Sequence, residues 1–232
     1  MKKQLNVRGR LLDLSTPAVM GILNVTPDSF YDGQRYETVA GALAQAETMI
    51  REGAGILDLG GQSTRPGSER IDAETEWQRI HPVLSAIRQR FPETIISIDT
   101  YHATVATRAV EAGAAIINDV SGGTFDPAMA DTVARLQVPY VLMHMQGTPE
   151  TMQVSPVYAD VVTDVLESLL ERVNLLRQKG VHDIIVDPGF GFGKTVDHNY
   201  ALLANLSRFQ QLGAPILAGL SRKSMINKVL DI

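Results

Sequence analysis

The sequence predicts an α/β protein with one parallel sheet, on three observations. Short apolar runs recur along the chain without strict alternation, as expected of strands covered on both faces. Amphipathic stretches separate these runs, so strands and helices alternate. Glycine precedes several runs, as in the matching segments 51–58 and 110–118, where it suits the left-handed residue that ends a helix. Because about seven strands follow one another without a long linker, we expect a TIM (β/α)8 barrel, here incomplete.

The expected strands and helices can be placed by residue number. The strands lie at residues 19–24, 56–59, 95–99, 116–118, 140–143, 184–187 and 216–218. The helices lie at residues 38–52, 74–89, 104–112, 127–136, 159–179 and 199–212, and a last one begins near residue 223. The sequence stops at Ile232, before an eighth strand and its helix. We therefore expect one domain over residues 1–232, truncated at its C-terminus.

The amino-acid composition of the chain argues against several kinds of partner and binding site. The chain has 232 residues, of which 44% are hydrophobic and 20% charged, which is enough apolar material for a substantial core. A net charge of -5 argues against nucleic acid as a partner. There is no cysteine for disulfides or a thiolate zinc site, and the five histidines lack metal-ligand spacing. Because no signal peptide or membrane span is apparent, we expect a cytoplasmic protein.

Polar residues stand at the expected carboxyl ends of the strands, where barrels build their active sites. Each one alone is equally typical of a turn or a helix cap. Together they predict a pocket that accepts hydrogen bonds from a donor-rich heterocycle. They are Asn24, Asp58, Asp99, Asn118, His144, Asp187 and Ser221.

The loop DPGFGFGK at residues 187–194 is the most distinctive stretch. Its glycines allow a ligand to approach closely, Phe190 and Phe192 provide apolar walls, and Lys194 adds a cation. Its end resembles a Walker A loop, but Pro188 stands where that motif needs its first glycine. Because proline lacks the N–H that binds phosphate, we exclude a P-loop ATPase. An ordinary strand-to-helix turn is the alternative interpretation.

Other segments also suit ligands. Three loops are candidates for active-site lids, or else surface turns, at residues 26–33, 62–70 and 147–157. Asn24, beside the acidic first loop, suits Mg2+ held partly through a substrate phosphate. Ser224 opens the last expected helix, whose free N–H groups would favour a carboxylate, and Lys223 could donate to a heterocycle.

These segments together resemble the dihydropteroate synthases, the pterin-binding transferases of folate biosynthesis. The matches run in family order through the whole chain, so the resemblance is specific. They are MGILNVTPDSF at 20–30, DLGGQSTRPG at 58–67, SIDT at 97–100, INDV at 117–120, LMHMQG at 142–147, DPGFGFGK at 187–194 and SRKS at 221–224.

The resemblance implies that p-aminobenzoate is joined to 6-hydroxymethyl-7,8-dihydropterin diphosphate, giving 7,8-dihydropteroate and diphosphate. The residues that it implies for pterin binding are Asp99, Asn118, Met143, Asp187 and Lys223. Three of them, Asp99, Asp187 and Lys223, would also serve catalysis together with Arg65. An ionised Asp187 could accept two hydrogen bonds from the guanidine-like edge of the pterin.

The resemblance also implies the surroundings of the second substrate. The residues that match the p-aminobenzoate pocket of the family are Thr64, Pro66, Phe192 and Ser224. It places Phe30 and Asp32 on a mobile loop and assigns Mg2+ to Asn24. It further implies competition by sulfonamides and, in a complete chain, a homodimer that binds these small molecules and neither nucleic acid nor membrane.

One family feature has no counterpart in this sequence. The last strand of the family carries an Arg-x-His motif that contacts the diphosphate. We therefore expect residues 1–232 alone to aggregate or dimerise and to release little diphosphate. Two alternatives stay open: a folate-binding methyltransferase domain, against which Thr64, Arg65, Pro66 and Ser224 argue, and a non-catalytic pterin-binding remnant.

Overall fold

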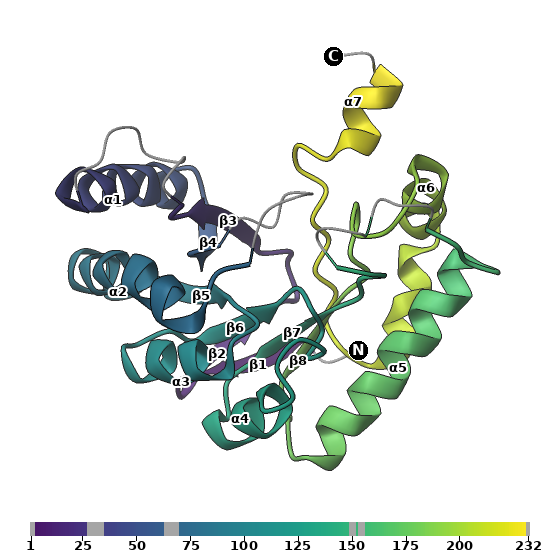
Figure 1. The fold of residues 1–232 in the computed structure, drawn as a ribbon, viewed down its shortest axis with the longest axis horizontal. Helices are drawn as coiled ribbons and strands as arrows, with labels where there is room; N and C mark the ends of the chain where they lie inside the picture. The colour runs from purple at the N-terminus through teal and green to yellow at the C-terminus, as the bar shows by residue number, and fades with distance from the viewer. Residues whose placement is uncertain (1–2, 27–34, 63–69, 149–151, 153–155, 231–232) are drawn as a thin grey trace.

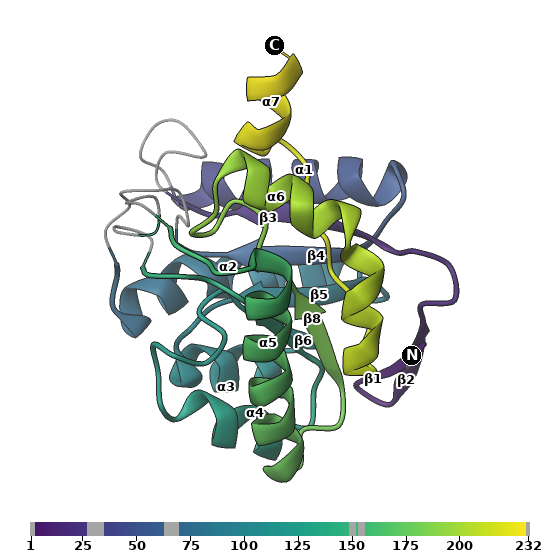
Figure 2. The same ribbon diagram turned by 90° about the vertical axis from the view of Figure 1, so that its right-hand side faces the viewer.

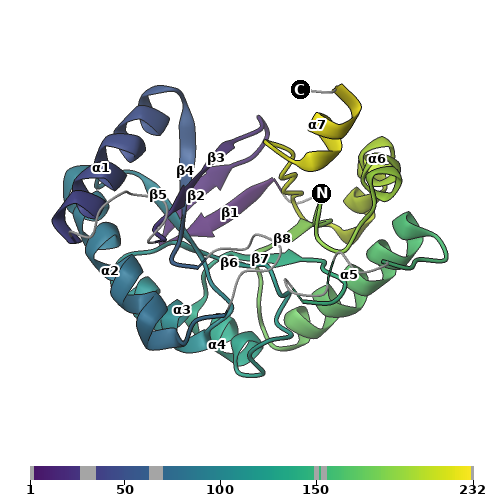
Figure 3. The same cartoon turned by 45° about the horizontal axis from the view of Figure 1, so that its top comes forward.

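The computed structural model describes residues 3–26, 35–62, 70–148, 152 and 156–230. Six parallel strands form one sheet in the order β3-β4-β5-β6-β7-β8, which is also their order along the chain. Figures 1 and 3 show that the sheet is curved and that helices α1 to α5 surround its outer side. Among the described strands β3 pairs with β4 alone, so the barrel is not closed. The predicted α/β fold of the TIM-barrel type is confirmed.

Six of the seven predicted strands are present within two residues of the expected bounds. The sheet contains β3 (Val19–Asn24), β4 (Ala54–Gly60), β5 (Ile95–Asp99), β6 (Ile116–Asp119), β7 (Tyr140–Met143) and β8 (Ile184–Asp187). The helices are α1 (Arg35–Arg51), α2 (Ala73–Arg90), α3 (Ala103–Glu111), α4 (Met129–Leu136), α5 (Val161–Gln178), α6 (Val196–Ala204), the 3-10 helix η1 (Leu206–Leu212) and α7 (Ser224–Leu230). In the described part of the chain, none of these helices has the length and apolar character of a membrane span.

Two predicted elements differ from the structure. The helix expected at 199–212 is divided into α6 and η1, because Asn205 ends α6 by donating from its side chain to the Ala201 carbonyl at 2.9 Å. The strand expected at 216–218 is wrong: Ile216 alone forms a bridge, to Val186. The apolar run there lies between Pro215, which lacks an N–H, and a glycine, and is too short to extend the ladder.

An N-terminal hairpin was not expected from the sequence. Its strands, β1 (Gln4–Val7) and β2 (Arg10–Asp13), are antiparallel, and Arg8 and Gly9 between them have φ of 56° and 82°. Positive φ at both residues is what a two-residue type I′ turn requires. Figure 2 shows the hairpin and α7 toward opposite ends of the molecule. The hairpin therefore lies away from the carboxyl-end rim of the strands.

The two faces of the sheet pack against different groups of side chains. Side chains such as Leu57 and Ile98 pack outward against the helices in the larger core. Side chains pointing inward from the lower part of the strands form a second core with the hairpin: Leu5, Val7, Ile56, Ile116, Val141 and Ile185. Since side chains alternate along a strand, the next inward positions toward the carboxyl ends include Asp58, Ser97 and Asn118. The polar rim therefore stands directly above the inner core.

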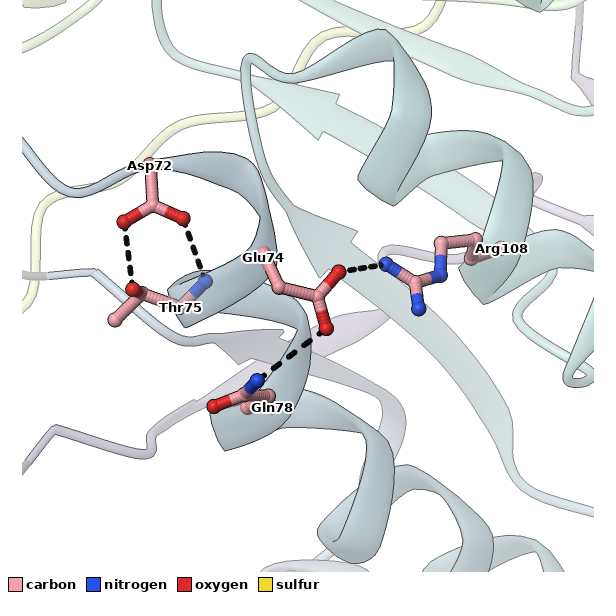
Figure 4. A network of polar contacts seen from close by, with 5 residues as sticks. All are labelled: Asp72, Glu74, Thr75, Gln78 and Arg108. Carbon is pink, nitrogen blue, oxygen red and sulfur yellow. Dashed lines mark hydrogen bonds and ion pairs between the residues drawn. The ribbon is translucent and has the colours of Figure 1, made fainter.

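The start of α2 is held by a polar network beside this rim (Figure 4). Asp72 caps the helix, because its carboxylate accepts from the Thr75 N–H at 2.9 Å and from the Thr75 hydroxyl at 2.6 Å. Glu74 accepts from Gln78 at 3.3 Å and pairs with Arg108 of α3 at 2.6 Å. The network thereby fixes α2 against α3 immediately after β4 and its following loop.

Candidate active site

The residues predicted to bind a pterin meet at the carboxyl ends of the strands. Asp99 of β5 stands in register with Asn118 of β6, and Met143 of β7 with Asp187 of β8. Lys223 reaches the same place from the chain before α7, because its ammonium lies 4.3 Å from the ring centroid of Phe192 in the β8 loop. The structure thus brings together all five residues of the predicted pterin set.

Asp187 is a buried carboxylate that has one hydrogen-bond donor among the described residues. Its side chain is 8% exposed, and Oδ1 accepts from the Gly189 N–H at 2.7 Å. Burial raises the pKa of Asp187 to about 6, although the Gly189 N–H and the cations of Lys223 and Lys194 oppose the rise. At neutral pH the group is therefore ionised and can accept further hydrogen bonds from a ligand.

Asp99 and Asn118 lie in a concentration of carboxylates. Burial raises the pKa of Asp99 well above its ordinary value, and the nearby Asp58 and Glu76 raise it further. Asn118 donates from Nδ2 to Asp58 Oδ2 at 2.9 Å, inside the barrel. This concentration of hydrogen-bond acceptors suits a ligand edge that carries several N–H groups, or a cation.

Asp119 follows Asn118 in β6, so its side chain lies on the opposite face of the sheet and has a different role. It points to the outer side of the sheet, where it accepts from Ser121 twice, from the Gly123 N–H and from the Tyr140 hydroxyl, all within 3.0 Å. These bonds fix the turn after β6. Asp119 therefore has a structural role, and Asn118 faces the site.

Lys223 supplies the cation of the site. Burial lowers its pKa, and Asp187 opposes this effect. Its side chain lies over Phe192 and beside Gly191, where a Cβ would stand 3.2 Å from the Lys223 Cδ. A side chain at Gly191 would thus displace the lysine, which explains the glycine there.

Lys194 has a different place from the one expected. The sequence suggested a cation at the end of a ligand loop, but the side chain is 3% exposed and points into the protein. Its ammonium lies 3.0 Å from the carbonyl oxygens of Gly189 and Phe192, 3.3 Å from that of His144 and 3.0 Å from His144 Nδ1. Burial lowers the pKa of Lys194 to about 7 and that of His144 to about 3. Lys194 therefore joins the loops after β7 and β8.

An apolar wall borders the polar residues, and sequence reasoning found only part of it. It is formed by Tyr101, Val120, Phe125, Met143, Met145 and Phe192. Phe190, expected in the same wall, instead packs in the core between sheet and helices. No local sequence pattern marked Tyr101 or Phe125, because they follow different strands and meet only in the fold, with ring centroids 5.2 Å apart.

The chain as a whole matches a known family. A family model described as pterin binding enzyme matches residues 20–232. The chain belongs to the pterin-binding enzyme family.

Similar members of the pterin-binding enzyme family are dihydropteroate synthases. That of Haemophilus influenzae is 47% identical over 98% of this chain and 83% of its own length. A solved structure of the Xanthomonas albilineans enzyme with 4-aminobenzoic acid has a TM-score of 0.91 and 43% identity, covering 100% of this chain and 82% of that one. A Yersinia pestis enzyme in a sulfonamide drug complex has a TM-score of 0.91 and 43% identity, covering 99% and 83%.

Several residues that the family resemblance implied are not placed by the structure. Those that lie outside the described residues are Phe30, Asp32, Thr64, Arg65 and Pro66. Ser224 is described and is the exposed first residue of α7. The residues on either side of 63–69 have defined contacts: Gln62 accepts from the Tyr101 hydroxyl at 2.7 Å, and the Arg70 guanidinium lies 3.7 Å from the centre of the Phe125 ring.

The oxygens beside β3 are of the kind that bind a hard cation. Asn24 is exposed at the end of β3, and Gly60 separates it from Asp99 in the register of the sheet. A Cβ at Gly60 would lie 3.5 Å from Asn24 Oδ1 and 3.6 Å from Asp99 Oδ2. Within the described residues no group of three or more His, Cys, Asp or Glu side chains could hold a metal. An amide and a carboxylate suit Mg2+ whose remaining ligands are water and phosphate.

Proposed function

We propose that the protein is a transferase that catalyses the dihydropteroate synthase reaction of folate biosynthesis. It would join p-aminobenzoate to 6-hydroxymethyl-7,8-dihydropterin diphosphate. The observation that carries this proposal is one rim that holds three acceptors and one cation: Asp99, Asn118, Asp187 and Lys223. Similarity to dihydropteroate synthases over almost the whole chain supports it.

The pterin would bind through its hydrogen-bond donors. Asp187 would accept from the 2-amino group and a ring N–H, and the bond from Gly189 holds its carboxylate in place beforehand. A carboxylate has about four acceptor sites, so one internal bond leaves enough for a bidentate contact. Asp99 and Asn118 would accept from the other donors, Lys223 would donate to the carbonyl side, and Met143 would pack against the ring.

The second substrate would lie farther out along the same loop. We place the ring of p-aminobenzoate beside Phe192 and its carboxylate near Ser224, with Thr64 and Pro66 completing the pocket. Because a related enzyme has been solved with a sulfonamide drug, we expect sulfonamides to compete with p-aminobenzoate. Inhibition that an excess of p-aminobenzoate fails to relieve would contradict this placement.

The reaction forms one C–N bond and breaks one C–O bond. Diphosphate leaves the pterin methylene with the electron pair of the C–O bond, the arylamine nitrogen attacks that carbon, and the nitrogen then loses a proton. We propose that departure runs ahead of attack. The acceptors around the ring would stabilise the cation-like methylene, and Lys223 and Arg65 the departing charge. Positioning and electrostatics would therefore supply most of the acceleration.

Mg2+ would assist at the β3 side of the rim. When bound, it would neutralise part of the charge of the leaving diphosphate. Asn24 and Asp99 would hold it, because their oxygens lie on either side of Gly60 with no side chain between them. The diphosphate would complete its coordination.

Diphosphate release with both substrates, and with each one omitted, tests the proposed reaction. We expect release only with both, together with 7,8-dihydropteroate detected by mass spectrometry. Thermal protection by methyltetrahydrofolate, rather than by the pterin diphosphate, would instead indicate a methyltransferase domain. Pterin binding without turnover would indicate a non-catalytic pterin-binding protein.

We also propose that the protein works in the cytoplasm as a homodimer, with small molecules as its partners. Light scattering on the purified protein gives the mass of the particle. A mass of one chain at working concentration would contradict the dimer.

A further inference from the structure

A buried polar pair lies beneath the pterin residues and takes no part in the proposed chemistry. Asp58 of β4 is 2% exposed, Ser97 of β5 is 0% exposed, and the two stand opposite each other in the β4–β5 register. Asp58 Oδ2 accepts the Asn118 Nδ2 hydrogen bond of 2.9 Å. Within the described residues, Asp58 Oδ1 and Ser97 Oγ have no hydrogen-bond partner. Among the described residues the side-chain hydrogen bond of good geometry at Asp58 is the one to Asn118, a residue of the site, while burial raises the pKa of Asp58 and the nearby Ser97 lowers it.

This bond determines which way the Asn118 amide faces. The structure places Asn118 Nδ2 against Asp58 Oδ2, and a carboxylate oxygen accepts, so the NH2 group of Asn118 faces Asp58. Its Oδ1 then stands at the other end of the amide, on the side of the rim, next to Asp99 in the register of the sheet. A flipped amide would set two acceptors against each other inside the barrel and present a donor at the rim.

We propose that Asp58 is a positioning residue, which selects the hydrogen-bonding group that Asn118 presents to the substrate. It makes the Asn118 position an acceptor, as Asp99 and Asp187 already are, so that the pocket prefers a heterocycle with a donor facing Asn118. The identity of that heterocycle as a pterin rests on the proposed function.

The burial of Asp58 indicates that this residue serves function rather than stability. A buried carboxylate without full pairing lowers stability, and an unpartnered polar atom beside it adds to that cost. An apolar side chain would suit this position of the inner core better, as Ile56 does two residues earlier on the same face. In the described part of the chain, the hydrogen bond that Asp58 gains in return is the one from Asn118.

Two substitutions at Asp58 separate positioning from charge. Asp58→Asn still offers an oxygen to Asn118, and its new NH2 group would point toward Ser97 Oγ. We expect the pterin Kd to stay within about threefold of the wild type. Asp58→Leu has the same number and branching of side-chain heavy atoms but no acceptor, so the Asn118 amide is free to turn, and we expect the pterin Kd to rise by at least about tenfold.

Turnover kinetics test whether the effect is specific. For Asp58→Leu, the KM for the pterin diphosphate should rise while that for p-aminobenzoate stays within about twofold, because only the pterin contacts Asn118. A general collapse of the site would raise both. Ser97→Ala is the matched control, since it removes the other unpartnered buried atom without touching Asn118, and it should leave both KM values unchanged.

A double substitution gives the sharpest test. Asn118→Asp alone sets two carboxylates against each other and should weaken pterin binding by at least about tenfold. Adding Asp58→Asn supplies an NH2 group to the new carboxylate and should restore most of the affinity. Wild-type affinity in Asp58→Leu, or no recovery in the double variant, would overturn the inference. Calorimetric titration with a pterin needs no turnover, so it tests the role of Asp58 independently of catalysis. Failure of the wild type to release diphosphate would refute the proposed function and leave this inference standing.

Discussion

The two sides of the carboxyl-end rim are built differently. From β5 to β8 the polar residues are buried or half-buried, and two of them already have protein partners, Asp187 in Gly189 and Asn118 in Asp58. At β3, Asn24 is exposed and the neighbouring Gly60 has no side chain. The first side therefore keeps its geometry before any substrate arrives, whereas the second leaves room for a cation and its phosphate ligands.

This difference separates two kinds of effect. On the β5–β8 side the same contacts stabilise the fold and shape the pterin site, so a substitution should change both. On the β3 side a substitution should change cation binding and leave the free energy of unfolding as it is. The predictions below test this separation, from the largest expected effect to the smallest.

The largest effect is expected at Gly189. Its φ is +73°, and a Cβ there would overlap the carbonyl oxygen of His144. Gly189→Ala should therefore reduce the free energy of unfolding by at least about 3 kcal/mol, from backbone strain and overlap together, and abolish pterin binding. Thermal and urea denaturation measure the first effect, and calorimetry the second.

Gly180→Ala is the matched control for this substitution. Gly180 has a similar φ of +89°, but a Cβ there would meet nothing within 4 Å. Strain alone should lower stability by about 1–2 kcal/mol and leave pterin affinity unchanged. Equal losses in the two variants would show that the packing of the β8 loop against His144 is unimportant.

Asp187→Asn should have the next largest effect, on binding more than on stability. The amide oxygen would keep the bond from the Gly189 N–H, and its NH2 group would then face the donors of the pterin. We expect the pterin Kd to rise by about 30- to 150-fold, equivalent to about 2–3 kcal/mol. Calorimetric titration measures this, with the exposed Glu167→Gln as a carboxylate-to-amide control. Unchanged affinity would remove Asp187 from the pterin site.

The sequence predicted the rim well and its internal contacts poorly. Asp99, Asn118 and Asp187 could be found because branched apolar runs mark parallel strands, and the carboxyl ends of parallel strands share one edge. The strand at 216–218 failed because an apolar run between proline and glycine is too short for a ladder. Local composition gives no measure of how many backbone partners such a run will find.

Lys194 illustrates the limit of local reasoning more directly. Its position after a glycine-rich loop suggested an exposed cation, yet its partners include His144, fifty residues earlier in the chain. Whether a lysine turns inward depends on carbonyl groups that only the fold brings together. The same holds for Tyr101 and Phe125, whose rings meet across two loops. The hairpin, by contrast, had a local signal in the alternation around Arg8 and Gly9.

A smaller effect, dependent on pH, is expected at Glu76, behind the rim. Its carboxylate accepts from Thr100 at 2.7 Å, and burial raises its pKa from 4.5 to about 7. Because the folded state then binds a proton that the unfolded state releases, stability should fall as pH rises from about 4.5 to about 7. Glu76→Gln keeps an acceptor for Thr100 and removes this titration.

Denaturation at pH 6 and pH 8 measures the difference. Relative to Glu76→Gln, the wild type should lose roughly 1–2 kcal/mol between these pH values. The exposed Glu74→Gln is the control and should keep the wild-type dependence on pH in this window, because Glu74 pairs with Arg108 at the surface. An identical pH profile for Glu76→Gln and the wild type would show that Glu76 does not titrate there.

The smallest effect is expected at Asn24. This substitution directly tests whether the β3 side of the rim is independent of the β5–β8 side. Asn24→Ala removes one neutral oxygen from an open position, so the Mg2+ concentration needed for half-maximal turnover should rise by about three- to tenfold. The midpoint of thermal unfolding and the pterin Kd measured without Mg2+ should stay at their wild-type values, because the Asn24 side chain is not part of the buried side. Asn174→Ala, an exposed position in α5, controls for loss of an amide elsewhere. If Asn24→Ala lowered stability or pterin affinity as much as Asp187→Asn does, the two sides of the rim would form one coupled unit, and the cation could not be assigned to a separate, open part of the site.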